Sequence, residues 1–314
     1  MMIVIPIPAL GAGLLAALLY HAEVQGWIYG ITVPFLPILV FALATMRYSH
    51  HGAITAGVMA SITLLFLWSP MHALAHCTAQ IIPAIIFFRS LMMVAIDPER
   101  KLLHWTPLGY ALTLACMYTA LFYLALGMSE HAFPFMLEQS YLSDIPLLIE
   151  QIQKEFPDYK FSKEMLQEIL ISSLWCHYVV MLILAAGLAH QIIQCFSASP
   201  RPSVHLTPYV PAHPIFILLL LVWFCGAEMT GAFAHSARIA GIILLIPYTC
   251  SGIAALHNAI KRFHLPRTNL IFFAVYASCI IIPVIGSTLL ATSTLYGLYS
   301  YARIALMRAH PSRR

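Results

Sequence analysis

The chain has 314 residues, of which 61% are hydrophobic and 9% charged, and its mean hydropathy is +0.85. Soluble domains carry about 25% charged residues, so this composition excludes a water-soluble globular protein, a disordered chain, a collagen-like chain and a coiled coil. The net charge of +4 is scattered over short loops and the C-terminus, which indicates membrane topology and lipid headgroups rather than nucleic acid as a partner. The long apolar runs predict a polytopic helical membrane protein.

Nine apolar segments qualify as membrane-spanning helices, because a spanning helix needs about 20 predominantly apolar residues. We expect an all-α, polytopic transmembrane bundle of eight or nine spans, forming a single domain over residues 1–314. Ser69-Pro70 separates the third segment from the fourth, which predicts a tight antiparallel hairpin. The segments are 3–20, 28–46, 52–69, 73–96, 107–127, 170–195, 213–229, 237–258 and 269–295.

The first segment begins MMIVIPIPALGAGLLAALL and lacks both a basic start and a small-residue cleavage site, so we predict a retained transmembrane helix rather than a signal peptide. Ala9, Gly13 and Ala17 recur at a spacing of four residues, with Ala12 and Ala16 beside them. Small residues at this spacing let a second helix approach closely. They predict either packing within the chain or docking to a separate membrane partner.

Residues 129–169, between the fifth and sixth segments, form an acidic insertion. Apolar residues recur there at helical spacing until Pro157, which predicts an amphipathic helix. Ser162 is placed to cap a second helix that runs into the segment beginning near Leu170. The insertion is either a solvated cap over the end of the bundle or a helix on the membrane surface, and its acidity disfavours the second alternative. It holds eight of the twelve acidic residues: Glu130, Glu138, Asp144, Glu150, Glu155, Asp158, Glu164 and Glu168.

The distribution of Lys and Arg predicts the orientation in the membrane. The loops after the second, fourth and eighth segments are basic, whereas those after the first and third carry no Lys or Arg. A cytoplasmic N-terminus places all three basic loops in the cytoplasm and the acidic insertion outside it. The arginines near the C-terminus also favour the cytoplasm, which nine full spans do not allow. Eight full spans, or a last segment that turns back near Pro283-Gly286, would resolve this conflict.

Arg89 lies inside the fourth segment, toward its basic end. A charge within a span is costly and needs water or a partner, so Arg89 either snorkels to the headgroups, binds an anion or substrate, or forms a structural pair. Glu228 ends the seventh segment at the opposite membrane face, so we expect no direct pair with Arg89.

Prolines within apolar segments remove an amide donor and free carbonyl groups, which can line a binding cavity. Pro83 and Pro247 are two of them, and His257 near the end of the eighth segment can form hydrogen bonds across helices. Together with Arg89, these three residues are the candidate ligand-binding residues. The remaining prolines of this kind are Pro34, Pro37 and Pro283.

No metal site, cofactor or enzymatic activity is predicted. His72 and His76 lie one helical turn apart, beside Cys77, and such a pair can share a metal, but no acid or third His lies nearby in the sequence. Packing at the membrane interface is therefore the preferred interpretation. The patterns GxxxxGK[ST], HExxH, GxSxG and SxxK do not occur.

The Ala/Gly-rich first helix, the motifs IPAIIFFRSLMM and HWTPLGYALTLA, and the late stretch SARIAGIILLIPYTCSGIAALHNAIKRF together resemble the YybS-like bacterial membrane proteins, a family of unknown function. The resemblance covers most of the chain and is best from Pro247 to Arg262. That family is distantly similar to the S-components of energy-coupling-factor vitamin transporters. The resemblance implies small-molecule binding, docking through Ala9, Gly13 and Ala17 or through Ala12 and Ala16, and a membrane coupling protein with ATPase subunits as partner. The greater length and the acidic insertion depart from S-components.

Three functions are compatible with these features. The first is a small-molecule-binding or transport subunit in the bacterial cytoplasmic membrane, which depends on a partner for energy because the chain has no phosphate-binding loop. The second is a non-transporting scaffold or assembly factor that binds partners through the acidic insertion. The third is a membrane enzyme acting on a lipid or an isoprenoid, whose candidate groups are His72, His76, Arg89 and Glu228.

Overall fold

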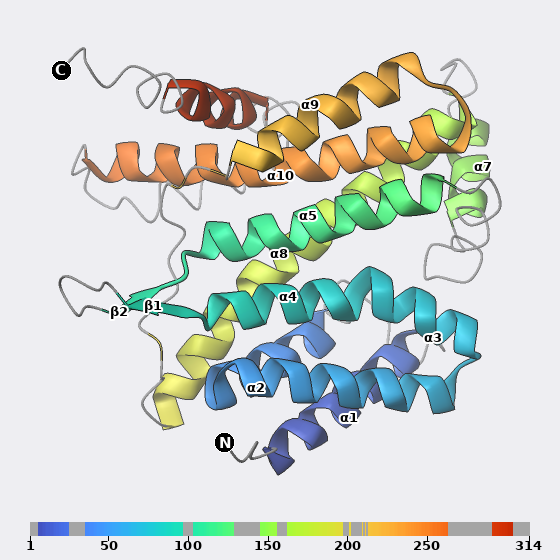
Figure 1. Cartoon of the computed structure of the whole chain (residues 1–314). Coiled ribbons are helices and arrows are strands. Elements are labelled where there is room, and N and C mark those ends of the chain that lie inside the picture. The colour runs from blue at the N-terminus through green and yellow to red at the C-terminus, as the bar shows by residue number, and fades with distance from the viewer. Residues whose placement is uncertain are drawn as a thin grey trace.

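The computed structural model describes residues 6–24, 35–96, 103–128, 145–155, 162–196, 201, 209, 211, 213–262 and 291–303. Helices dominate these residues, as the sequence predicts, and one short pair of strands accompanies them (Figure 1). The elements are α1 (Ile7–Val24), α2 (Phe35–Leu67), α3 (Pro70–His76), the π-helical turn η1 (Cys77–Ile81), α4 (Ile82–Leu91), β1 (Val94–Ile96), β2 (Leu103–Trp105), α5 (Leu108–Gly127), α7 (Ile145–Glu155), α8 (Lys163–Phe196), α9 (His213–Glu228) and α10 (Gly231–Arg262). Residues 291–303 are also helical.

Five of the described helices are long and apolar enough to cross a membrane. They are α2, the continuous helix Pro70–Leu91, α5, α8 and α10, whereas α1 and α9 are apolar but shorter. The described parts of the segments predicted before residue 260 lie mainly on these apolar helices. Most of the segment predicted at 269–295 lies outside the described residues. This set of helices is that of an integral membrane protein.

Helix α2 is a hairpin of two limbs rather than one straight rod. Ser49 has φ 59° and ψ −154°, which breaks the helix between the segments predicted at 28–46 and 52–69. In a straight helix Phe41 and Gly57 would be about 24 Å apart. Instead, a Cβ added to Gly57 would lie 3.6 Å from Cε1 of Phe41. The two limbs are therefore antiparallel neighbours.

A second hairpin forms at Ser69-Pro70, as predicted. Ser69 caps α3, and its Oγ accepts a hydrogen bond of 3.3 Å from the amide of His72. The segment predicted at 73–96 ends early, however, because α4 stops at Leu91 and Val94–Ile96 pairs with Leu103–Trp105 as antiparallel strands. An apolar run does not by itself distinguish a helix end from a short strand, which explains the error.

Helix α8 joins the two parts of the bundle. It runs diagonally behind α4 and α5 (Figure 1) and packs against both α2 and α10. The predicted cap is present at its start, where Ser162 Oγ accepts a 3.1 Å hydrogen bond from the amide of Met165. The amphipathic α7 packs on α8 through its buried Ile149, while Glu150 and Glu155 are exposed.

The bundle has two ends of opposite charge. At one end, which we call the basic end, α2 turns, α4 ends and α5 begins. At the other, which we call the acidic end, α5 and α9 end and α8 and α10 begin. Among the residues whose side chains the structure describes, the basic end carries Arg47, Arg89 and Arg201, and α10 also ends there with Lys261 and Arg262. The acidic end carries Glu150, Lys154, Glu155, Glu168, Glu228 and Arg238.

Candidate functional site

The small-residue stripe of α1 lies inside the chain. Ala9 and Ala17 have no exposed surface, and Gly13 faces α2 so closely that an added Cβ would overlap the carbonyl of Ala56 and lie 2.8 Å from Cβ of Met59. Of the two predicted alternatives, packing within the chain and docking to a partner, the structure shows the first as an interface between α1 and α2. The close approach follows from the absence of side chains on the stripe.

Arg89 is exposed near the end of α4, at the basic end. Glu228 is exposed at the acidic end, so the two residues do not pair, as expected.

Pro83 follows the π-helical turn η1. Its ring has no N–H, and the helix accommodates this with a wider turn, in which the amide of Ile82 reaches the carbonyl of Cys77. The hydroxyl of Tyr178 on α8 donates to the carbonyl of Gln80 at 2.6 Å. Carbonyl groups in this irregular turn are thereby satisfied by neighbouring helices, which lipid would not do.

We predict that Tyr178→Phe lowers the free energy of unfolding by about 1–2 kcal/mol, because it leaves the carbonyl of Gln80 without this buried donor. Thermal unfolding of the purified protein in detergent measures the change. Tyr110→Phe is the matched control, since Tyr110 is 47% exposed. Equal effects of the two substitutions would contradict this role of the hydroxyl.

Pro247 lies in the middle of α10, and its carbonyl accepts a 2.7 Å hydrogen bond from the hydroxyl of Tyr209. His257 is half-buried near the basic end of the same helix. Arg89 and Pro83 belong to α4, and α5 lies between α4 and α10 (Figure 1). The four predicted ligand-binding residues thus lie on two helices, Pro83 and Arg89 on α4 and Pro247 and His257 on α10.

The histidine pair of α3 is split between two environments. His72 is exposed, whereas His76 is buried between the rings of Tyr20 and Trp68, with ring centroids at 4.3 and 5.0 Å. Within the described ranges, no three His, Cys, Asp or Glu residues are grouped so that they could hold a metal ion. His76 is thus part of an aromatic cluster at the acidic end.

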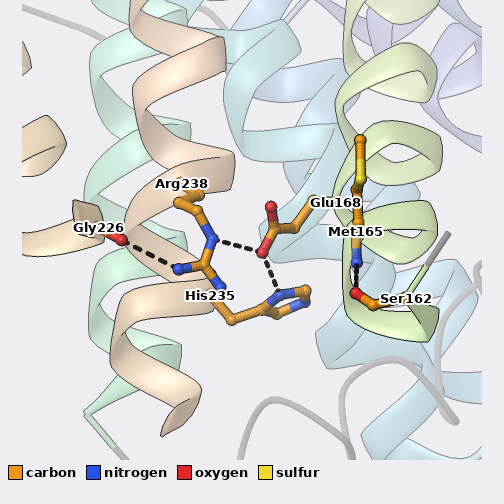
Figure 2. A network of polar contacts seen from close by, with 6 residues as sticks. All are labelled: Ser162, Met165, Glu168, Gly226, His235 and Arg238. Atoms are coloured by element: carbon orange, nitrogen blue, oxygen red, sulfur yellow. Dashed lines mark hydrogen bonds and ion pairs between the residues drawn. The ribbon is translucent and has the colours of Figure 1, made fainter. Parts of the chain in front are cut away.

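A network of charged side chains, which the sequence analysis did not single out, connects three helices at the acidic end (Figure 2). Oε1 of Glu168 on α8 lies 2.6 Å from Nε of Arg238 and 2.9 Å from Nδ1 of His235, both on α10. Nη1 of Arg238 donates to the carbonyl of Gly226 on α9 at 3.0 Å. We call Glu168, His235 and Arg238 the charged cluster.

The charged cluster lies largely out of water. The side chains of Glu168 and His235 are 12% and 10% exposed, whereas that of Arg238 is 42% exposed. A carboxylate taken from water loses its hydration, and its two donors must offset that loss. The arrangement holds an anion between a guanidinium and an imidazole and leaves one side of the guanidinium accessible.

Sequence features could have identified two members of this cluster. His235 and Arg238 are three residues apart and therefore share one face of α10, and Arg238 lies at the start of an apolar segment. Glu168 is separated from them by about 70 residues, and only the fold brings it there. Its place within the acidic insertion suggested an ordinary solvated residue.

Arg201 is a second residue that the sequence analysis did not identify. It is 6% exposed at the basic end and donates to the carbonyls of Leu91 and Thr106, the second at 3.0 Å. Its guanidinium lies 5.8 Å from the ring centroid of Trp105. Burial lowers the pKa of Arg201 to about 10, so Arg201 stays charged at neutral pH. Its hydrogen bonds connect the chain between α8 and α9 to the residues that flank the two strands.

Comparisons with known proteins found no relative of this chain. The chain matches no family model, no curated protein and no solved structure.

Proposed function

We propose that this chain is the small-molecule-binding subunit of a membrane transport system. The observation that carries the proposal is the charged cluster, in which Glu168 is held by Arg238 and His235 between apolar helices. Ionisable residues are costly within membrane helices and mark functional sites there. If these side chains only packed α8 against α10, apolar side chains of similar volume would stabilise the contact equally well.

The cluster favours a ligand with a carboxylate group. Arg238 uses Nε for Glu168 and Nη1 for Gly226, and among the described residues Nη2 has no partner. Guanidinium groups bind carboxylates through parallel N–H groups. A small carboxylic acid can therefore bind at the exposed side of Arg238, or take the place of Glu168, with His235 as a further donor.

The orientation makes this site accessible from outside the cell. With the basic end in the cytoplasm, the N-terminus is cytoplasmic, because α1 begins at that end, and the charged cluster faces the extracytoplasmic side. The setting is the bacterial cytoplasmic membrane, crossed by eight or nine spans, with the acidic insertion outside. Energy comes from a coupling protein with ATPase subunits, in keeping with the resemblance to the YybS-like family.

Thermal unfolding in detergent, with a panel of small mono- and dicarboxylic acids, tests this proposal. A ligand at 100 times its Kd stabilises the folded protein by about 2.7 kcal/mol. We expect at least one acid to raise the Tm of the wild type and of Arg303→Gln, an exposed arginine elsewhere, but not that of Arg238→Gln. The proposal fails if no acid raises the Tm, or if Arg238→Gln responds like the wild type.

A further inference from the structure

Two buried serine hydroxyls beside the charged cluster have no hydrogen-bond partner. Ser172 and Ser236 are 4% and 0% exposed, and within the part of the chain that the structure describes nothing bonds to their Oγ atoms. Ser172 follows Glu168 by four residues on α8, so the two share a helix face, with Cβ atoms about 5–6 Å apart. Ser236 directly follows His235 on α10. Each of the two helices that build the charged cluster thus carries one unpaired hydroxyl.

These two serines differ from other hydroxyl side chains of the bundle. Many Ser and Thr hydroxyls of the described helices donate to the carbonyl four residues earlier, which satisfies the hydroxyl within its own helix. They are those of Thr45, Ser61, Thr63, Thr78, Thr113, Thr119 and Thr249. Ser172 and Ser236 do not donate to the corresponding carbonyls, those of Glu168 and Ala232. Because a buried hydroxyl without a partner costs free energy and is rare in native structures, both hydroxyls are suited to pair with a bound molecule.

Both serines lie where α5, α8 and α10 meet. Trp175, three residues after Ser172 on α8, donates from Nε1 to the hydroxyl of Tyr123 on α5 at 3.3 Å. Gly127 follows Tyr123 by four residues, on the same face of α5, and lies against Ser236, whose Oγ would be 2.7 Å from a Cβ added to Gly127. One face of α5 therefore contacts the parts of α8 and α10 that carry the two serines, next to the charged cluster.

We infer that the ligand of the charged cluster is a short hydroxy acid, whose carboxylate binds Arg238 and whose hydroxyl group pairs with Ser172 and Ser236. This inference rests on the function proposed above. A ligand carboxylate that takes the place of Glu168 brings the rest of the molecule into the space of the Glu168 side chain, beside Ser172. A serine hydroxyl both donates and accepts, so it pairs with an alcohol group in either direction. A second carboxylate would instead lose its hydration to two neutral hydroxyls.

Titrations followed by thermal unfolding in detergent test the inference with two matched pairs of acids, lactate against propionate and 3-hydroxybutyrate against butyrate. We expect the wild type to bind at least one hydroxy acid about tenfold more tightly than its alkyl counterpart, because a site that pairs with a hydroxyl rejects an analogue lacking it. Ser172→Ala and Ser236→Ala should each reduce this preference and leave the affinity for the alkyl acid unchanged. Ser61→Ala, whose hydroxyl donates to the carbonyl of Gly57 on α2, is the matched control and should keep the preference.

The stability of the ligand-free protein separates a binding role from a structural one. Ser172→Ala and Ser236→Ala should keep or raise the Tm, because the hydroxyls that they remove have no partner. Ser61→Ala should lower the Tm, because its hydroxyl bonds to a carbonyl. A Tm lowered as much by Ser172→Ala and Ser236→Ala as by Ser61→Ala would show that these serines bond within the folded chain, and would overturn the inference.

The binding results distinguish a failure of this inference from a failure of the proposed function. If acids raise the Tm through Arg238 but both members of each pair bind equally well, only the hydroxy acid is wrong, and the serine hydroxyls pair with water. If the wild type prefers the hydroxy acid and both Ser172→Ala and Ser236→Ala keep that preference, the serines are not its partners. If no carboxylic acid raises the Tm, the proposed function fails and the hydroxy acid fails with it.

Discussion

Gly13→Leu should destabilise the protein by about 3 kcal/mol or more. A Cβ at this position would overlap the carbonyl of Ala56, which belongs to a helix backbone and cannot turn away as a flexible side chain would. The substitution would therefore push α1 off the second limb of α2 and uncover Ala9 and Ala17. We expect a large loss of folded protein in detergent, measured by size-exclusion chromatography and by thermal unfolding.

Gly11→Leu is the control for this prediction. Gly11 lies on the same helix, two residues earlier, and nothing is within 4 Å of its added Cβ. Side chains beside it on the outer face, such as Leu14 and Leu15, are 41% and 49% exposed. Gly11→Leu should therefore be close to neutral. Equal stability of the two variants would show that α1 does not pack on α2 through Gly13.

Glu168→Gln is expected to lower the free energy of unfolding by about 2 kcal/mol. The variant keeps the shape of the side chain but removes the negative charge between Arg238 and His235. Removing one partner of a buried ion pair costs about 3–5 kcal/mol, and the 42% exposure of Arg238 reduces that cost. Thermal unfolding measures the effect, with Glu228→Gln, an exposed acid at the same end, as control.

A double-mutant cycle with Arg238→Gln separates the ion pair from other effects of the substitution. If Glu168 and Arg238 stabilise each other, the double variant loses less stability than the sum of the single variants. Additive losses would mean that the 2.6 Å contact contributes little.

The sequence predicts the start of a helix best where the signal is local. Ser69-Pro70 and Ser162 are recognisable because a serine side chain caps the amides that follow it within the same few residues. The sequence analysis missed the end of α4 because the apolar residues MMVAI are compatible with both a helix and a strand. The spacing of Ala9, Gly13 and Ala17 predicts a helix partner but does not identify which helix it is.

Contacts between segments far apart in the chain could not be predicted from the sequence. Nothing near Pro83 indicates that Tyr178, almost 100 residues later, donates to the π-helical turn that precedes it. The charged cluster likewise depends on α8 and α10 meeting at the acidic end, which brings Glu168 to Arg238. The candidate ligand residues were chosen from single positions, and α5 separates the helices that carry them.

The central claim is that the charged cluster holds a small carboxylic acid for a partner-dependent transport system. Purification of the wild type and of Arg238→Gln from bacterial membranes in mild detergent, followed by mass spectrometry of the proteins and small molecules retained, tests it most directly. We predict that both carry an ATPase-bearing partner and that only the wild type carries the acid. A wild type that retains neither, or an Arg238→Gln variant that retains the same small molecule, would contradict the account.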